Sequence, residues 1–396
     1  MRKTKTKKQS VQPQFKGDIG QIDMPFFMLI LALLAMGLIM LASASYATNL
    51  SEYGDSYHDI KRQLIFAVLG VVGMLGVAYF DYHRLRKFAF PVLVIAAVML
   101  VIVLLPTPIS YAVGDANRWI KIGGLTFQPS EIGKFAIILG FSQYISRNFN
   151  RLDEFKVGPL PLFATLAVIV FLIAIETHLS GAIITLVTGT IVLFVGGIQK
   201  RWIALTYGVC GVGAFALISF TSYMGDRITA WLHPFDHLKD KGWQVVQSLY
   251  AIGSGGLFGV GLGQSRQKHN YLPEAANDYI FSIACEELGL VGAIFIIFLF
   301  AMLVWRGFMI AMRARDKFGS LLAIGITSRV AVQTILNIAV VTNTLPSTGI
   351  TLPFFSYGGT ALVILLLEMG IVLSVSRFGY LDKTPPTPQK QIQKGQ

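Results

Sequence analysis

The sequence QSRQKHNYLPEAANDYIFSIACEELG, residues 264–289, leads from a polar segment directly into a long apolar one. Its polar half carries two basic residues, Arg266 and Lys268, followed by an acidic turn with Glu274 and Asp278. The apolar run that follows is long enough to predict a membrane helix. The stretch therefore predicts a carboxylate at a membrane surface, beside positive charge.

The composition of the whole chain agrees with a membrane protein. Of 396 residues, 54% are hydrophobic and only 14% are charged, and the mean hydropathy is +0.62. An ordinary soluble domain has roughly a quarter of its residues charged. Apolar runs of about 20 residues cross a bilayer, so the sequence predicts an all-α polytopic membrane protein with about ten transmembrane helices. We expect them near residues 24–44, 64–80, 88–105, 131–146, 161–176, 180–197, 203–220, 283–305, 320–342 and 359–376.

Basic residues in alternate short loops predict the orientation of the chain. By the positive-inside rule these loops and both termini are cytoplasmic, and the loops at 45–63, 106–130, 221–282 and 343–358 lie outside. The net charge of +12 reflects this signal and attraction to anionic lipid, so no nucleic-acid partner is expected. We predict disordered cytoplasmic tails at 1–20 and 381–396, and a single transmembrane domain at 21–380 with a large extracytoplasmic loop, 221–282, before the eighth helix.

The loop before the fourth helix contains the next candidate residues. The sequence from Gln128 to Glu131 predicts a helix start, and Lys134 shares a helix face with Glu131 about one turn inside the membrane. A lysine there is either a snorkelling residue in a structural ion pair or part of a cavity for an anionic ligand. Upstream, Arg118 and Trp119 are either an interfacial anchor or a site for a lipid phosphate.

Three further features of the sequence point to no catalytic or metal-binding chemistry. A lone histidine, His178, makes no metal site, and the two cysteines lie in or beside apolar helices, where a thiol acts as a small hydrophobe. The glycine-rich run GSGGLFGVGLG at 253–263 resembles a phosphate-binding loop, but no strand precedes it, so a nucleotide fold is not expected. We expect its flexible backbone to close over a lipid headgroup instead.

Two charged residues are expected inside the bilayer. Arg329 and Glu368 lie in the ninth and tenth helices, both roughly 12–14 Å from the cytoplasmic face at 1.5 Å per residue. Because an unpaired charge there costs at least about 2.5 kcal/mol, we predict a structural ion pair on the cytoplasmic half, far from Asp278. Alternatively, either residue faces a water-filled cavity or another polar group.

Several long motifs resemble those of the SEDS family of peptidoglycan polymerases, the FtsW, RodA and SpoVE proteins. The resemblance covers nearly the whole chain, and the form of the YLPEA and QSRQK segments is closest to the FtsW/SpoVE branch. Arg329 and Glu368 are not among the motifs. The matching motifs are RWI…FQPSE at 118–131, QSLYAIGSGGLFGVGLGQSRQK at 247–268, YLPEAANDYIF at 271–281, EELG at 286–289 and LPSTGITLPFFSYGG at 345–359.

The resemblance implies a ten-helix glycosyltransferase that polymerises lipid II outside the cell membrane. It implies a cognate class B penicillin-binding protein as partner, and other membrane proteins of the divisome or elongation machinery. The essential aspartate of the family falls on Asp278, its arginine-tryptophan pair on Arg118 and Trp119, and its helix-four lysine on Lys134. Whether the chain acts in division, elongation or sporulation stays open.

The chain departs from the family pattern at two places. Where many members have an acid in a PDLGT-like turn, it has Thr177-His178-Leu179-Ser180-Gly181, and after SYGG it has Thr360-Ala361 in place of a serine pair. Any role of that acid cannot be transferred to this chain.

The chemistry of the residues agrees with the implied reaction. Joining two lipid-linked sugars requires a base near the acceptor hydroxyl and cations near the departing pyrophosphate. A single inverting displacement needs one carboxylate base, for which Asp278 is the candidate. A divalent cation, Mg or Mn, can assist this displacement, but the sequence shows no cluster of residues that would bind one. A lipid II flippase or transporter and a non-catalytic division scaffold remain as alternatives. The candidate substrate-binding residues are Arg118, Trp119, Glu131, Lys134, Arg266, Lys268 and Glu274.

Overall fold

The computed structural model describes residues 20–105, 110–113, 116–122, 125–176, 178–220, 228–229, 231–237 and 242–379. The predicted tails lie almost entirely outside these ranges. Gly20 and Arg377 are joined by a backbone hydrogen bond of 2.9 Å, so the two ends of the described chain meet at one end of the bundle. That both termini are cytoplasmic stays a prediction.

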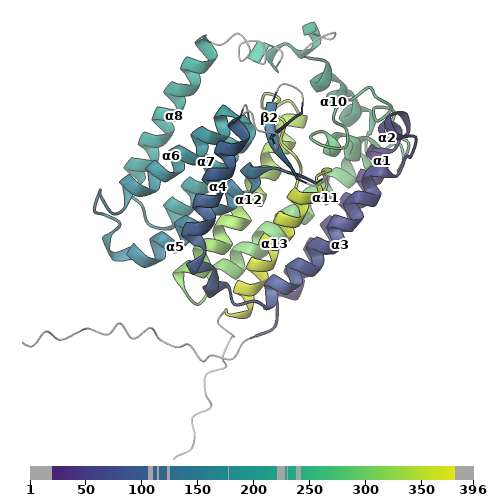
Figure 1. Ribbon diagram of the computed structural model, residues 1–396. Helices are drawn as coiled ribbons and strands as arrows, with labels where there is room; N and C mark the ends of the chain where they lie inside the picture. Colours follow the sequence, from purple (N-terminus) through teal and green to yellow (C-terminus); the bar gives the residue numbers. More distant parts are fainter. Residues whose placement is uncertain are drawn as a thin grey trace, which may run out of the picture.

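Ten helices of 16 or more residues form the bundle in the described part of the chain (Figure 1). All ten overlap the expected spans, which confirms the predicted helical membrane architecture. Five of them are long and apolar enough to cross a membrane by length and composition, and three more are apolar but shorter. The ten are α1 (Met24–Ala44), α3 (His58–Tyr79), α4 (Ala89–Leu104), α5 (Pro129–Asn148), α6 (Pro159–Ile175), α7 (Leu179–Val195), α8 (Lys200–Phe220), α11 (Ile280–Met312), α12 (Lys317–Val341) and α13 (Gly359–Arg377).

Helix α12 occupies the middle of the bundle. It packs against α5, α7, α11 and α13, and two thirds of its apolar window is buried inside the protein. Its polar side chains therefore face other helices rather than lipid. The shorter helical elements are α2 (Tyr46–Tyr53), α10 (Trp243–Ser254) and the 3-10 turns η1 (Tyr82–Lys87), η2 (Phe149–Arg151) and η3 (Pro234–His237).

A small antiparallel sheet, absent from the predicted elements, lies beyond the end of α4. Its strands β1 (Ser110–Val113), β2 (Ala116–Ile122) and β3 (Leu125–Phe127) are paired in the order β1-β2-β3. The strands are too short for a sequence pattern to distinguish them from a loop. The sheet and α10 lie at the end of the bundle opposite the start of α1 and the end of α13 (Figure 1).

Helix α11 has a non-helical residue at Gly289, and the glycine-rich run at 253–263 provides hydrogen-bond partners for the backbone around it. Gly289 has φ +68° and ψ −170°, a conformation that favours glycine. The run supplies backbone partners to α11, and its expected closure over a lipid headgroup stays a prediction. The bonds run from the N–H groups of Val260 and Gly261 to the carbonyls of Glu286 and Glu287, and from the N–H groups of Leu290 and Val291 to the carbonyls of Gly256 and Leu257.

Candidate functional site

Asp278 lies two residues before α11 at the end of the bundle that carries the sheet. It is half-buried, and its backbone carbonyl accepts a hydrogen bond of 2.8 Å from the Asn337 side chain of α12. A Cβ atom placed on Gly349 would lie only 3.1 Å from Oδ2 of Asp278. The carboxylate therefore faces the backbone between α12 and α13, where a glycine leaves room for it.

The loop between α12 and α13 holds the turn around Asp278. The Ser356 hydroxyl donates to the carbonyl of Asn277 at 2.6 Å, and the backbone N–H of Tyr357 donates to the carbonyl of Ala276 at 3.0 Å. Two motifs that are far apart in the sequence, at 271–281 and 345–359, thus form one structural unit. Its backbone is fixed by contacts that do not use the Asp278 carboxylate.

The surroundings of Asp278 tune its acidity. Burial, followed by the neighbouring Glu274 carboxylate, raises the pKa of its carboxyl to about 7, against the opposing effect of the Arg118 guanidinium. A general base is most effective when its pKa lies near the working pH. Glu274 itself is exposed and accepts a hydrogen bond of 2.6 Å from the side chain of Asn277. Its influence on Asp278 is electrostatic.

Arg118 is the extra residue of a bulge in β2. The register pairs Tyr111 with Trp119 and Ala112 with Asn117, so Arg118 has no partner in the ladder. Bulges redirect a side chain away from the sheet. The Arg118 Nε donates to the backbone carbonyl of Glu176 at 3.3 Å. The guanidinium therefore lies between the sheet and the end of α6, close enough to Asp278 to lower its pKa.

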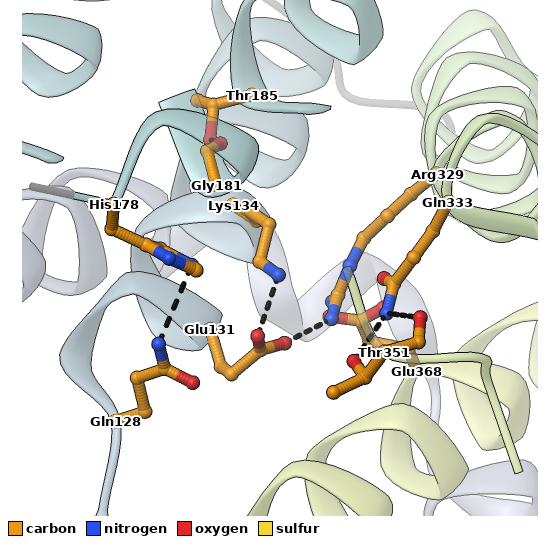
Figure 2. Close-up of polar contacts among 10 residues, drawn as sticks. All are labelled: Gln128, Glu131, Lys134, His178, Gly181, Thr185, Arg329, Gln333, Thr351 and Glu368. Carbon is orange, nitrogen blue, oxygen red and sulfur yellow. Dashed lines mark hydrogen bonds and ion pairs between the residues drawn. The ribbon is translucent and has the colours of Figure 1, made fainter. Parts of the chain in front are cut away.

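Four buried charged residues from three helices form what we call the charge cluster: Glu131, Lys134, Arg329 and Glu368 (Figure 2). The two oxygens of Glu131 bind Nζ of Lys134 and Nη2 of Arg329, each at 2.5 Å. The other terminal nitrogen of Arg329 binds Glu368. Two positive and two negative charges alternate, so the cluster is neutral as a whole.

The predicted Arg329–Glu368 contact is present, while its predicted place on the cytoplasmic half, far from Asp278, stays a prediction. Arg329 is the thirteenth of the 25 residues of α12 and so lies at mid-helix. Arg329 also binds Glu131, so both readings of the sequence hold in part. The pair is joined to two residues that the sequence assigned to substrate binding.

His178 occupies the place where the resembled family has an acid. Its Nε2 lies 3.4 Å from Nε2 of Gln128, and Gly181 gives its ring space, since a Cβ there would lie 2.2 Å from the imidazole Cδ2 (Figure 2). Burial, followed by the charges of Lys134 and Arg118, lowers the pKa of His178 to about 3. The imidazole is therefore neutral beside the charge cluster.

One face of α12 links the charge cluster to Asp278. Arg329, Gln333 and Asn337 are four residues apart, which places them on one side of the helix. The Gln333 amide donates to the carbonyl and the hydroxyl of Thr351, at 3.0 and 3.1 Å. Gln333 and Asn337 were not predicted as site residues, although two amides at this spacing within an apolar helix were the available signal.

Lys268 is not brought to Asp278. Its buried ammonium binds Oε1 of Glu287 at 3.2 Å, the Ser43 hydroxyl at 3.1 Å and the Gly263 carbonyl at 2.6 Å. An ammonium has three N–H donors, and these three contacts use them all. This placement argues against the predicted contact with substrate. Lys268 instead anchors its loop to α11.

The other predicted cation of this loop, Arg266, is exposed and lines a separate cavity between α10 and α11. Among the described residues, no group of three His, Cys, Asp or Glu side chains is placed to hold a metal ion. A divalent cation in the reaction stays a prediction.

The fold and the site define a class: a multi-pass helical membrane protein with a half-buried carboxylate at one end of the bundle, linked to a buried charge cluster. The chain belongs to the FtsW/RodA/SpoVE family, described as cell cycle proteins, whose model matches residues 24–381. The predicted family is thereby confirmed.

Two relatives show how far the similarity extends. Stage V sporulation protein E of Bacillus subtilis is 39% identical over 90% of this chain and 97% of its own length. A probable peptidoglycan glycosyltransferase FtsW of Trichlorobacter lovleyi is also 39% identical, over 90% of this chain and 94% of its own.

Solved structures agree with the fold. A chain of a peptidoglycan synthase complex, whose structure describes the coordination of polymerization and crosslinking, is similar with a TM-score of 0.74 and 25% identity, over 91% of this chain and 99% of that one. The rod shape determining protein RodA of Thermus thermophilus has a TM-score of 0.67 and 26% identity, over 91% and 98%.

Proposed function

We propose that this chain is a peptidoglycan glycosyltransferase that joins lipid II units into glycan strands at the outer face of the cell membrane. The observation that carries the proposal is Asp278, a carboxylate with a pKa near neutrality whose backbone is clamped by the α12–α13 loop. The names of the FtsW relatives and the synthase complex among the similar structures support the enzyme class.

The proposed reaction is a single displacement. Asp278 removes the proton from the acceptor hydroxyl, whose oxygen forms a bond to the anomeric carbon of the donor sugar. The bond from that carbon to the lipid pyrophosphate breaks, and the pyrophosphate leaves with the electron pair. Arg118 and Lys134 stabilise the negative charge that develops on the leaving group.

A direct assay tests this function against its alternatives. The purified chain, with its cognate class B penicillin-binding protein, is incubated with lipid II in vesicles. Glycan strands support the polymerase, whereas movement of lipid II headgroups across the vesicle without polymer supports a flippase. Neither product from a folded complex supports a scaffold.

The proposal also covers the partner protein, the orientation of the chain in the membrane and its cellular role. The similar structure of a synthase complex supports a class B penicillin-binding protein as partner, and the basic loops support cytoplasmic termini and an extracytoplasmic Asp278. Similarity to SpoVE and FtsW relatives supports a septal or sporulation role.

The rate of polymerisation is expected to depend on pH through Asp278. A general base acts in its ionised form, so activity should fall as the pH drops through about 7, the raised pKa of this carboxyl. The initial rate of polymerisation is measured from pH 5.5 to 8.5. The logarithm of this rate, plotted against pH, should rise with a slope near one below the pKa and then level off. A rate that is flat across this range would contradict the role of Asp278 as base.

Lys134→Met should lower polymerisation by at least about tenfold, equivalent to about 1.4 kcal/mol of transition-state stabilisation. Methionine keeps an apolar stem of similar length but removes the cation that binds Glu131. The measurement compares kcat/KM for lipid II with thermal stability of the same preparation. Normal kcat/KM in a thermally destabilised variant would show that Lys134 serves only as a structural ion-pair partner.

A further inference from the structure

We infer that the cavity between α10 and α11 is a second carbohydrate site, which holds uncharged sugar residues of the growing glycan strand; this inference rests on the proposed function. The cavity, which we call the α10 cavity, has a volume of about 810 Å³. Pockets for small ligands commonly measure about 300–1,000 Å³. Its polar lining includes Tyr250, Ser254, Gln264, Arg266, Gln267 and Glu286.

The floor of the α10 cavity is rigid. Glu286 is buried, and its two oxygens accept hydrogen bonds from the backbone N–H of Arg266 at 2.9 Å and from the Ser265 hydroxyl at 2.5 Å. The backbone N–H of Ser265 also donates to the Glu287 carboxylate at 3.3 Å. The loop that carries Arg266 and Gln267 is therefore fixed before a ligand arrives, which reduces the entropy lost on binding.

Two polar groups of this loop have unused hydrogen-bonding capacity. The Gln267 Oε1 atom is buried and has no hydrogen-bond partner among the described residues. A buried acceptor without a partner is costly, so a rotation of the Gln267 side chain that lets Oε1 accept from a ligand hydroxyl would recover that cost. The Arg266 side chain likewise has no ion pair or hydrogen bond with any described residue.

The charge of the α10 cavity selects the class of ligand. Its lining contains one guanidinium, Arg266, and one carboxylate, Glu286, so the two charges cancel. A pyrophosphate, which carries several negative charges, would therefore gain little net attraction from this lining. Planar amide and guanidinium groups instead pair well with neighbouring hydroxyls, and the Tyr250 ring, 49% exposed, offers an apolar face to a sugar ring.

The position of the α10 cavity fits a strand that leaves Asp278. Asp278 lies two residues before the start of α11 at Ile280, and Glu286 lies six residues after that start, about 9 Å at 1.5 Å per residue. The cavity and Asp278 thus lie at the same end of α11, which suits a strand several sugars long. A strand held there stays on the enzyme between additions, so loss of the site should shorten the product while the first bond still forms.

Binding of an uncharged oligosaccharide tests the site apart from catalysis. The probe is the tetramer of N-acetylglucosamine, titrated calorimetrically into the complex with its partner in nanodiscs, with inorganic pyrophosphate as the anionic comparison. We expect saturable binding of the tetramer, weakened about tenfold or more by Tyr250→Ala and by Gln267→Leu, and unchanged in Asp278→Asn. No tetramer binding, or binding of pyrophosphate to the cavity instead, would overturn the inference.

Product length provides the second readout. With lipid II, Tyr250→Ala and Gln267→Leu should give strands several-fold shorter than the wild type at a similar rate of first-bond formation. The matched control is Tyr53→Ala, which removes an exposed aromatic ring of α2 outside the cavity and should leave strand length unchanged. Strands of normal length from both cavity variants overturn the inference, while a wild type without any polymer refutes the proposed function instead.

Discussion

Asp278→Asn should reduce glycan polymerisation at least about a hundredfold, since a general base contributes roughly 10²–10⁴-fold to a rate. The amide has nearly the shape of the carboxylate but cannot accept the hydroxyl proton. The structure indicates that the fold will tolerate it, because Asn337 binds the backbone carbonyl of Asp278 and not its side chain. The measurement is polymer yield from lipid II, alongside membrane insertion and partner binding, both of which should be normal.

A control separates loss of the base from general loss of charge. Asp55 lies in the turn before α3, and its carboxylate binds Lys61 of that helix at the protein surface. Asp55→Asn should leave the yield of glycan polymer unchanged. If Asp278 only caps the start of α11, its replacement would cost about 1 kcal/mol and leave activity largely intact. Near-normal polymer from Asp278→Asn would therefore remove it as the base.

Breaking the charge cluster should destabilise the protein by about 3–5 kcal/mol, the usual effect of leaving a buried charge without its partner. Arg329→Met leaves Glu368 alone and the cluster at −1, whereas Glu368→Gln leaves it at +1. The double variant restores neutrality with Glu131 and Lys134 still paired. We expect it to be less destabilised than the sum of the single variants.

A double-mutant cycle measures this coupling. Unfolding of the four proteins in detergent, followed by heat or denaturant, should give a coupling of about 1–3 kcal/mol between Arg329 and Glu368. Additive losses would show that each residue depends on other neighbours. Polymerisation by the double variant then reports whether the neutral Glu131–Lys134 pair is sufficient for activity.

The helices were predictable because a bilayer demands long apolar runs. Their ends were less so: α11 extends to Met312, well past the apolar run, and begins three residues earlier than expected. The sheet was missed because strands of three to seven residues leave no distinctive pattern. The break at Gly289 depends on a loop about 30 residues upstream, which periodicity alone does not reveal.

Site residues were predictable where they lie within a single sequence motif. They were not predictable where their role depends on contacts between distant parts of the chain. Asp278 and the Glu131–Lys134 pair were identified from local sequence. The contacts of Lys268 were not predicted because its partner, Glu287, lies 19 residues further along the chain, and only the fold shows that its donors are used. The contact of Arg329 with Glu131 was not predicted because the two residues lie on different helices, 198 residues apart in the sequence.

The charge cluster also constrains how the chain enters the membrane during synthesis. Glu131 and Lys134 arrive together on α5 and neutralise each other, but Arg329 arrives on α12 before Glu368 has been made. An arginine at the centre of an inserting helix costs about 2.5–3.5 kcal/mol, and α12 has the lowest hydropathy of the five long apolar helices. The translocation machinery would therefore retain α12 until α13 emerges, and release the two helices into lipid as a hairpin.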